Sequence, residues 1–259
     1  VEQWHNAGLI EPHAIAPFQF EKEEAHKRFH RWLGSHFFRP DDLTQLARTR
    51  GLRPVYLPFF TFDATVEVTY SAEFARGVHT ELEASPQEIE WVQQTYYPRV
   101  EVDDLPVSAS STLPEKAVRQ ISPFHLKALT EYRPEFLADW PAEVYQLSLE
   151  DANLLARKRL QERGESEARK HAAVRGQYRA FVVTNTEIYR TSFKHILLPV
   201  WIGAYRYKNE LYRVLLNGQT GKAGGEAPTD WVKVALVAAG ALALLALLGA
   251  VAARLLIVR

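Results

Sequence analysis

The sequence predicts an α+β fold, in which helices and antiparallel β meanders form two related halves, followed by one C-terminal transmembrane helix. Three observations predict this fold class. Apolar residues recur at helical spacing in residues 21–38 and 148–175. Aromatic and β-branched residues crowd residues 55–70 and 181–216, which is typical of strands. A run of 20 uncharged residues then extends from residue 234 to residue 253.

The composition sets the first limits. The chain has 259 residues, 31 basic and 31 acidic side chains, and neither cysteine nor methionine. The lack of cysteine excludes a disulfide scaffold or a thiolate zinc site within this sequence. Because 47% of the residues are apolar and 24% are charged, the chain can bury a core. The lack of methionine predicts a processed or trimmed product from which an N-terminal module is missing.

The first half begins with a helix over residues 21–38, and a short helix follows Asp41 or Asp42 and is closed by Gly51. A long strand is predicted over residues 55–70, where apolar and polar residues alternate. Residues 89–97 are expected to pair with it.

Residues 103–141 are predicted as short helical pieces separated by prolines. Ser122-Pro123 is interpreted as the cap and first residue of one of these helices.

The second half begins with a long helix, because Ser148 and Asp151 form a capping box before a run that continues to about Arg175. Strands are then predicted over residues 181–189, 196–207 and 211–216. Turns are predicted at residues 208–210 and at Asn217-Gly218.

Two similar strands suggest an internal repeat. Leu57-Pro58 and Leu198-Pro199 both enter aromatic strands, so we expect them to mark equivalent strand starts; chance similarity of two apolar strands is the alternative. The predicted organisation is an N-terminal arm or linker over 1–20, a soluble domain over 21–226 with halves 21–147 and 148–226, a linker over 227–233, and a transmembrane helix over 234–258.

The run over 234–253 contains nine Ala, six Leu, three Val and two Gly. As a helix it would be about 30 Å long, the thickness of a hydrocarbon core, and the alternative is a buried core helix. Small residues at close to four-residue spacing predict that this helix packs against another transmembrane helix. These residues are Ala235, Ala239, Ala243, Ala246, Gly249, Ala250 and Ala253.

No catalytic, cofactor-binding or metal-binding residue is predicted. Residues 216–223 depart from the phosphate-binding loop pattern, and His26 and His30 lie beside basic residues that would repel a cation. Asp103 and Asp104 have no partner at an identifiable catalytic spacing. Aromatic residues late in the chain are predicted to contact a protein partner, namely Trp201, Tyr205, Tyr207 and Tyr212.

Taken in order, several segments resemble a family of bacterial membrane-anchored zinc-ribbon proteins that are often named as related to the primosomal helicase. The resemblance lies in Pro17-Phe18, Trp32-Leu33 and residues 37–43, 55–59, 103–110, 193–202, 204–207 and 217–221. Members of that family carry an N-terminal four-cysteine zinc ribbon, so the resemblance implies zinc only in a missing N-terminal segment. Related proteins are associated with membrane-stress assemblies that contain phage-shock-protein-A-like and band-7 proteins.

The predicted function is therefore that of a non-enzymatic single-pass membrane adaptor or accessory subunit, with other membrane proteins and the lipid bilayer as partners. The predicted location is the inner membrane, with a C-terminal anchor and a cytoplasmic domain, since no signal peptide is visible. The alternative is a nucleic-acid-linked protein that depends on the missing zinc ribbon. The residues before the apolar run carry 29 basic and 31 acidic side chains, which makes nucleic acid a disfavoured partner.

Overall fold

A computed structural model describes residues 9–46, 48–49, 51–76, 89–110, 113, 115–138 and 140–257. The chain forms two compact units. Unit 1 consists of Val1–Pro17, Tyr56–Glu115 and His125–Leu198, and unit 2 of Phe18–Val55, Lys116–Phe124 and Pro199–Arg259. The predicted halves, residues 21–147 and 148–226, do not coincide with these units, because each unit combines segments from distant parts of the sequence.

Unit 1 is built on long strands and one long helix. Its elements are β1 (Ala14–Ile15), most of β3 (Arg53–Arg76), β4 (Glu90–Tyr96), β5 (Arg99–Ser108), η1 (Leu126–Ala128), β6 (Thr130–Glu131), η2 (Pro134–Leu137), α5 (Leu149–Arg175) and the first part of β7 (Tyr178–Tyr207). The strand order is β4-β3-β7-β1-β6, and β5 also pairs with β3. Strand β1 is parallel to β7 and antiparallel to β6, so the sheet is mixed.

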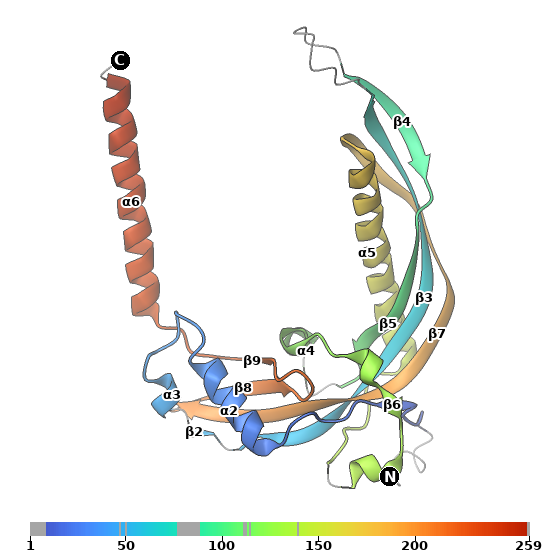
Figure 1. Cartoon of the computed structure of the whole chain (residues 1–259), viewed down its shortest axis with the longest axis vertical. Helices are drawn as coiled ribbons and strands as arrows, with labels where there is room; N and C mark the ends of the chain where they lie inside the picture. The colour runs from blue at the N-terminus through green and yellow to red at the C-terminus, as the bar shows by residue number, and fades with distance from the viewer. Residues whose placement is uncertain are drawn as a thin grey trace. The chain divides into compact units, whose positions relative to one another are not determined.

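Helix α5 covers one face of this sheet (Figure 1). Its buried residues recur at every fourth position, as Ala152, Ala156, Leu160, Gly164, Ala168 and Ala172. The later positions pack against alternate residues of β3, namely Ala64, Val66, Val68, Tyr70, Ala72 and Phe74, whereas Ala152 and Ala156 pack with Phe60, Phe62 and Val107. Because most of the helix positions in the contact are small, the helix axis can approach the sheet closely.

Unit 2 contains the remaining elements. They are α2 (Lys22–Leu33), α3 (Leu43–Leu46), β2 (Arg48–Thr49), α4 (Glu115–Ile121, whose first residue is assigned to unit 1), the end of β7, β8 (Glu210–Asn217), β9 (Ala223–Gly225) and α6 (Trp231–Ile257). The end of β7 pairs with β2 and β8, and β8 pairs with β9, all antiparallel.

The core of unit 2 is aromatic. The Trp201 ring lies 5.3 Å from the Phe18 ring and 6.4 Å from the Phe20 ring, between centroids. Buried Asn217 fixes the turn after β8, since its amide group donates to the Ile121 and Pro123 carbonyls. Its side-chain oxygen accepts from the backbone of the turn itself, at Gln219 and Thr220.

Several sequence predictions are confirmed. The Ser148 hydroxyl caps α5 by accepting the Asp151 backbone N–H, and the helix ends at Arg175. Strand β4 pairs antiparallel with β3. Lys208 and Asn209 form the turn between β7 and β8 with positive φ angles of 43° and 72°.

The predicted fold class is wrong in its description of the sheet. The structure is a mixed α/β arrangement with one nine-stranded sheet among the described residues, instead of separate antiparallel meanders. Separate strands were predicted over 181–189 and 196–207, but β7 runs without a break through both, alongside β3. Neither Leu57-Pro58 nor Leu198-Pro199 starts a strand; both steps lie inside β3 and β7.

Two local predictions in the middle of the chain are also wrong. Residues 103–108 were predicted as part of a series of short helices, but they continue strand β5, because β3 supplies their backbone hydrogen-bond partners. Ser122-Pro123 follows α4 and is a cis peptide bond outside any helix.

The predicted transmembrane helix over 234–258 must likewise be corrected. Within the described residues, none of the helices combines the length and the apolar character needed to cross a membrane. This finding overturns the predicted single-pass anchor and the inner-membrane location that depended on it.

Candidate functional site

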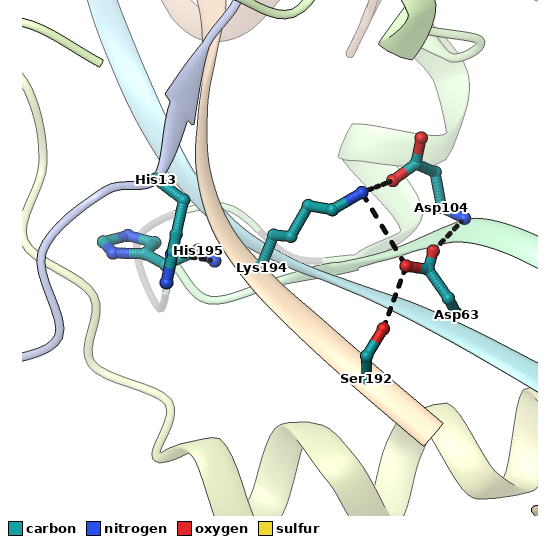
Figure 2. A network of polar contacts seen from close by, with 6 residues as sticks. All are labelled: His13, Asp63, Asp104, Ser192, Lys194 and His195. Atoms are coloured by element: carbon teal, nitrogen blue, oxygen red, sulfur yellow. Dashed lines mark hydrogen bonds and ion pairs between the residues drawn. The ribbon is translucent and has the colours of Figure 1, made fainter. Parts of the chain in front are cut away.

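A polar network lies where β3 and β5 lose their regular register (Figure 2). The pairing shifts between Phe62 and Ala64, so Asp63 faces the irregular stretch of β5 that contains Asp104. The Asp104 backbone, with φ at 50°, donates its N–H to Asp63 Oδ1 at 2.8 Å. The Ser192 hydroxyl of β7 donates to Asp63 Oδ2 at 3.0 Å. This β-bulge therefore joins three strands through one carboxylate.

Lys194 supplies the positive charge of the network. Its Nζ lies 3.4 Å from Asp104 Oδ1 and 3.7 Å from Asp63 Oδ2. Burial opposes the ionisation of Asp63, but the hydrogen bonds from Asp104 and Ser192 and the charge of Lys194 outweigh it and lower its pKa. Burial likewise opposes the charged form of Lys194, and the carboxylates of Asp104 and Asp63 raise its pKa above the ordinary value.

Carboxylate oxygens of Asp63, Asp103 and Asp104 lie within 4.8 Å of one another, which is the spacing of a metal site. A divalent cation there would compete with the Lys194 ammonium group, which already neutralises two of the three carboxylates. The arrangement therefore fits an internal ion pair that stabilises the bulge better than it fits a metal centre.

A second polar group of unit 1 is the buried His195, which ties the N-terminal segment to β7. Its Nδ1–H donates to the Ile10 carbonyl at 2.8 Å, and its backbone N–H donates to His13 Nδ1 at 3.0 Å. Rings of Phe60 and Tyr145 pack on it, with centroids 5.4 and 5.2 Å away. Burial lowers the pKa of His195 to about 4 despite backbone hydrogen bonds, so the ring is neutral near pH 7.

Unit 2 carries an exposed apolar surface of a different kind. We call Phe37, Phe38, Trp231 and Val232 the aromatic collar, because they surround the beginning of α6; their exposed fractions are 68, 45, 75 and 68%. Side chains of this size are seldom left so exposed in clusters unless they form an interaction site.

The loop that carries the collar is held in place by α6 and α2. The Asp230 backbone N–H donates to the Phe38 carbonyl at 2.7 Å, and Lys233 Nζ donates to the Arg39 carbonyl at 2.9 Å. The Arg39 guanidinium lies 4.0 Å from the centroid of the Trp32 ring and donates to the Trp32 and Leu33 carbonyls. Hydrogen bonds to backbone carbonyls therefore hold the part of the collar formed by Phe37 and Phe38 in place.

A hollow of about 500 Å³ opens beside the collar. It is lined by residues 33–37, 39–41, Thr44 and Lys233. Its wall thus combines the Phe37 ring with the cationic groups of Arg39 and Lys233 and the carboxylate of Asp41. Such a hollow can accept an apolar side chain flanked by polar groups.

A hollow of about 560 Å³ also opens in unit 1 between α5 and β7. Arg157, Lys158 and Glu165 line the helix side, and Thr184 and Asn185 line the strand side. The hollow is open to solvent and is lined by both basic and acidic side chains, so its side chains by themselves do not indicate one class of ligand.

The four aromatic residues predicted to contact a partner lie together in unit 2, but three are interior. Trp201, Tyr205 and Tyr207 are buried, and only Tyr212 is partly exposed. The Tyr205 hydroxyl donates to the Glu226 carbonyl, and the Tyr207 hydroxyl donates to Asp42. The hydrogen bond to Glu210 raises the pKa of Tyr212 to about 12. A role of this set in partner contact stays a prediction, and Tyr212 is its surface member.

The small residues predicted to pack α6 against a helix lie at its exposed surface where side chains are described, as Ala235, Ala239, Ala243, Ala246 and Gly249. The side chains of Ala250 and Ala253 lie outside the described part. A Cβ added at Gly240 or Gly249 would meet nothing within 4 Å.

Sequence reasoning missed both the collar and the bulge network. The adjacent aromatics Phe37 and Phe38 in a predicted helix end were the available signal for the collar. No local signal could bring Asp63, Asp104 and Lys194 together, because they come from three strands far apart in the sequence.

Comparison with known proteins adds little about activity. No family model matches the chain, and no solved structure matches it. The chain is similar to the uncharacterised protein YdjG of Bacillus subtilis strain 168, with 27% identity over 233 residues, which cover 88% of this chain and 67% of YdjG.

Proposed function

We propose that the chain is a non-enzymatic adaptor or accessory subunit that binds a protein partner through the aromatic collar. The observation that carries the proposal is the exposure of Phe37 and Phe38, on a loop that hydrogen bonds tie to the start of α6, and of Trp231, the first residue of that helix. Aromatic and arginine side chains are enriched at protein interfaces, where a few such residues contribute most of the binding energy.

Preorganisation supports the same proposal. Binding costs less when the contact residues are already ordered in the unbound protein. Phe38 and Arg39 are fixed by the first turn of α6, and the hollow beside Phe37 offers a concave element that a protruding apolar side chain can fill. The charged groups of Arg39, Lys233 and Asp41 at this hollow supply polar contacts around the apolar centre.

The first partners to test are phage-shock-protein-A-like and band-7 proteins, because proteins related to the family that the sequence resembles are associated with them. A tagged chain is mixed with each purified partner, and retention is measured on the affinity matrix. We expect one partner to be retained by the chain, and we expect Trp231→Ser to weaken retention by about 30-fold, the effect of a typical hot-spot residue.

Tyr97→Ser is the matched control, because Tyr97 is an aromatic residue of unit 1 with an exposed fraction of 65%, similar to that of Phe37. This variant should bind as the unchanged chain does. Equal loss in both variants, or no retention of either partner, would contradict the proposal.

A further inference from the structure

One edge of β7 lies open over much of unit 1. Residues 178–194 lie beside β3, and the Thr184 hydroxyl donates to the Thr69 carbonyl of β3 at 3.2 Å. The remaining strand pairings of β7, with β1, β8 and β2, all begin at residue 196 or later. Within the described part of the chain, the backbone groups on the edge of residues 178–194 that faces away from β3 are therefore not paired with a strand.

The sequence does not protect this edge against a further strand. Natural edge strands are commonly protected by charged side chains or by proline. Residues 180–186 contain neither, and four of these seven residues are β-branched, which favours strand pairing. Positive φ angles of 50° at Ala180 and 53° at Arg190 bound the stretch 181–189, which a second strand can follow.

The hollow of about 560 Å³ between α5 and β7 opens at the same edge. Strand β5 pairs with β3 on the edge opposite to β7. On the side of α5 toward β5, the Arg159 guanidinium donates to the Pro106 carbonyl at 2.7 Å. Because α5 contacts β5 on one side and borders the hollow on the other, it leaves room for a strand beside β7.

The charges along the hollow are separated by sign. Arg157 and Lys158 line one end of its helix wall, Glu165 lines the other end, and the uncharged Gln161 lies between them. The two ends are about 10 Å apart along the helix. Within the described residues, the side chains of Arg157, Lys158 and Glu165 form no ion pair. These charges are therefore available to a molecule that enters the hollow.

We propose that two copies of this chain pair antiparallel along residues 181–189 of β7, so that their sheets become one. A two-fold axis near Asn185, the centre of this stretch, places the α5 helices of both copies on the same face of the joined sheet. Because α5 runs along β7 (Figure 1), the two helices are then antiparallel. Arg157 and Lys158 of each copy come to lie opposite Glu165 of the other copy.

This arrangement of charge favours a second copy over a segment of another protein. Any extended chain can pair with the backbone of an open strand edge. A second copy pairs with the edge and also places every charged group that lines the hollow opposite a group of the other sign. It does so because the two-fold axis reverses the order of the basic and acidic ends.

Charge reversal tests the pairing, because two variants that each fail to pair with themselves should pair with one another. The acidic variant carries Arg157→Glu and Lys158→Glu, and the basic variant carries Glu165→Lys. None of these three side chains is buried, so the changes remove no core contact. Full-length copies with two different affinity tags are produced in the same cells and purified through one tag in a mild nonionic detergent. The retained amount of the other tag is then measured.

We expect unchanged copies to retain one another. The acidic variant should retain the basic variant at least fivefold more than either variant retains a copy of itself, because like charges face each other only in the self-pairs. Glu162→Lys is the matched control, since Glu162 is an exposed acidic residue of the same helix outside the hollow. The acidic variant should retain it less than it retains the basic variant.

Equal retention in every combination would show association through another surface, such as α6, and would overturn the pairing. No retention between unchanged copies would also overturn it, and this is the result expected if β7 pairs with a segment of another protein instead. The pairing does not involve the aromatic collar, whose partner binding is measured separately. Failure of the strand pairing therefore does not imply failure of the proposed function.

Discussion

At the residue scale, His195 shows how burial sets a protonation state. The ring is fully buried and its pKa is lowered to about 4, against an ordinary value of 6.5. The unfolded chain therefore binds a proton at a higher pH than the folded chain does. Stability from the neutral ring is fully present above about pH 6.5 and is lost as the pH falls toward 4.

We expect the free energy of unfolding to fall by about 2 kcal/mol through this group between pH 7 and pH 5. Urea unfolding at both pH values measures it. His195→Asn keeps an N–H that can donate to the Ile10 carbonyl but does not titrate, so it should show a smaller decrease. If the unchanged chain and His195→Asn lost the same amount of stability, His195 would not be the source of the pH dependence.

Asp63 gives a second prediction at this scale. Asp63→Asn should lower the free energy of unfolding by about 1 kcal/mol at pH 7, because the carboxylate loses charge-assisted contacts that solvent only partly screens. Since the pKa of Asp63 is lowered, its stabilisation is present above the ordinary value of 3.8 and is lost as the pH falls through the folded value. The difference between the two proteins should therefore shrink as the pH falls below the ordinary value of 3.8.

Glu67→Gln is the control for Asp63, measured by the same urea titrations. Glu67 forms a surface ion pair with Arg99, at 2.7 Å. Its loss should change stability less than the loss of Asp63, which joins three strands. A larger effect at Glu67 would contradict the role assigned to the bulge.

At the element scale, α5 lies close to β3 because its contact positions are small. An added Cβ at Gly164 would lie 2.7 Å from Val66 Cγ1 and 2.9 Å from Val68 Cγ2. Residues four apart lie about 40° from one another around a helix, so the buried positions of α5 form one continuous stripe. Glycine has a low helix propensity, but the absence of a side chain at Gly164 allows α5 to pack this close to β3.

We expect Gly164→Val to lower the free energy of unfolding by about 1–3 kcal/mol through overpacking, although valine has the better helix propensity. Ser166→Val places the same side chain on the exposed face of the same helix and should have a much smaller effect. Thermal and urea unfolding compare the two variants. Equal stability of the two would show that the helix can move away from the sheet without cost.

The same element explains one success and one failure of sequence reasoning. The start and end of α5 were predictable because Ser148 and Asp151 form a local cap. Strand β5 was not, because its backbone hydrogen bonds are supplied by β3, some forty residues away. Local signals determine helix ends, whereas the partner strand determines whether an irregular segment becomes a strand.

At the scale of the whole molecule, the exposed part of α6 contributes little to the stability of the fold. The described side chains of α6 beyond Val234 are exposed, while Asp230 and Lys233 hold the collar loop. A chain that ends after Lys233 should therefore keep its free energy of unfolding within about 0.5 kcal/mol. Urea unfolding of the shortened and the full-length chain measures the difference, and a large loss of stability would show that α6 contributes to the fold.

The candidate site was only partly predictable at this scale. An apolar C-terminal helix and late aromatic residues were visible in the sequence, but Trp201, Tyr205 and Tyr207 lie buried in the chain. The exposed aromatics of the collar are Phe37, Phe38 and Trp231; the first two are distant from Trp231 in the sequence, and the hydrogen bond between Asp230 and Phe38 brings them together. Hydrophobicity alone does not distinguish a core aromatic from an interface aromatic.

The sequence by itself determined the elements that depend on neighbours along the chain: the capped helix after Ser148, the long alternating strand β3, the turn at Lys208 and Asn209, and the helix at Trp231–Ile257. Only the tertiary structure decided which strands pair, which aromatics stay exposed and which carboxylates meet Lys194. The physical reason is that caps and turns are satisfied within a few residues, whereas burial, register and ion pairing depend on groups that folding brings together from distant segments.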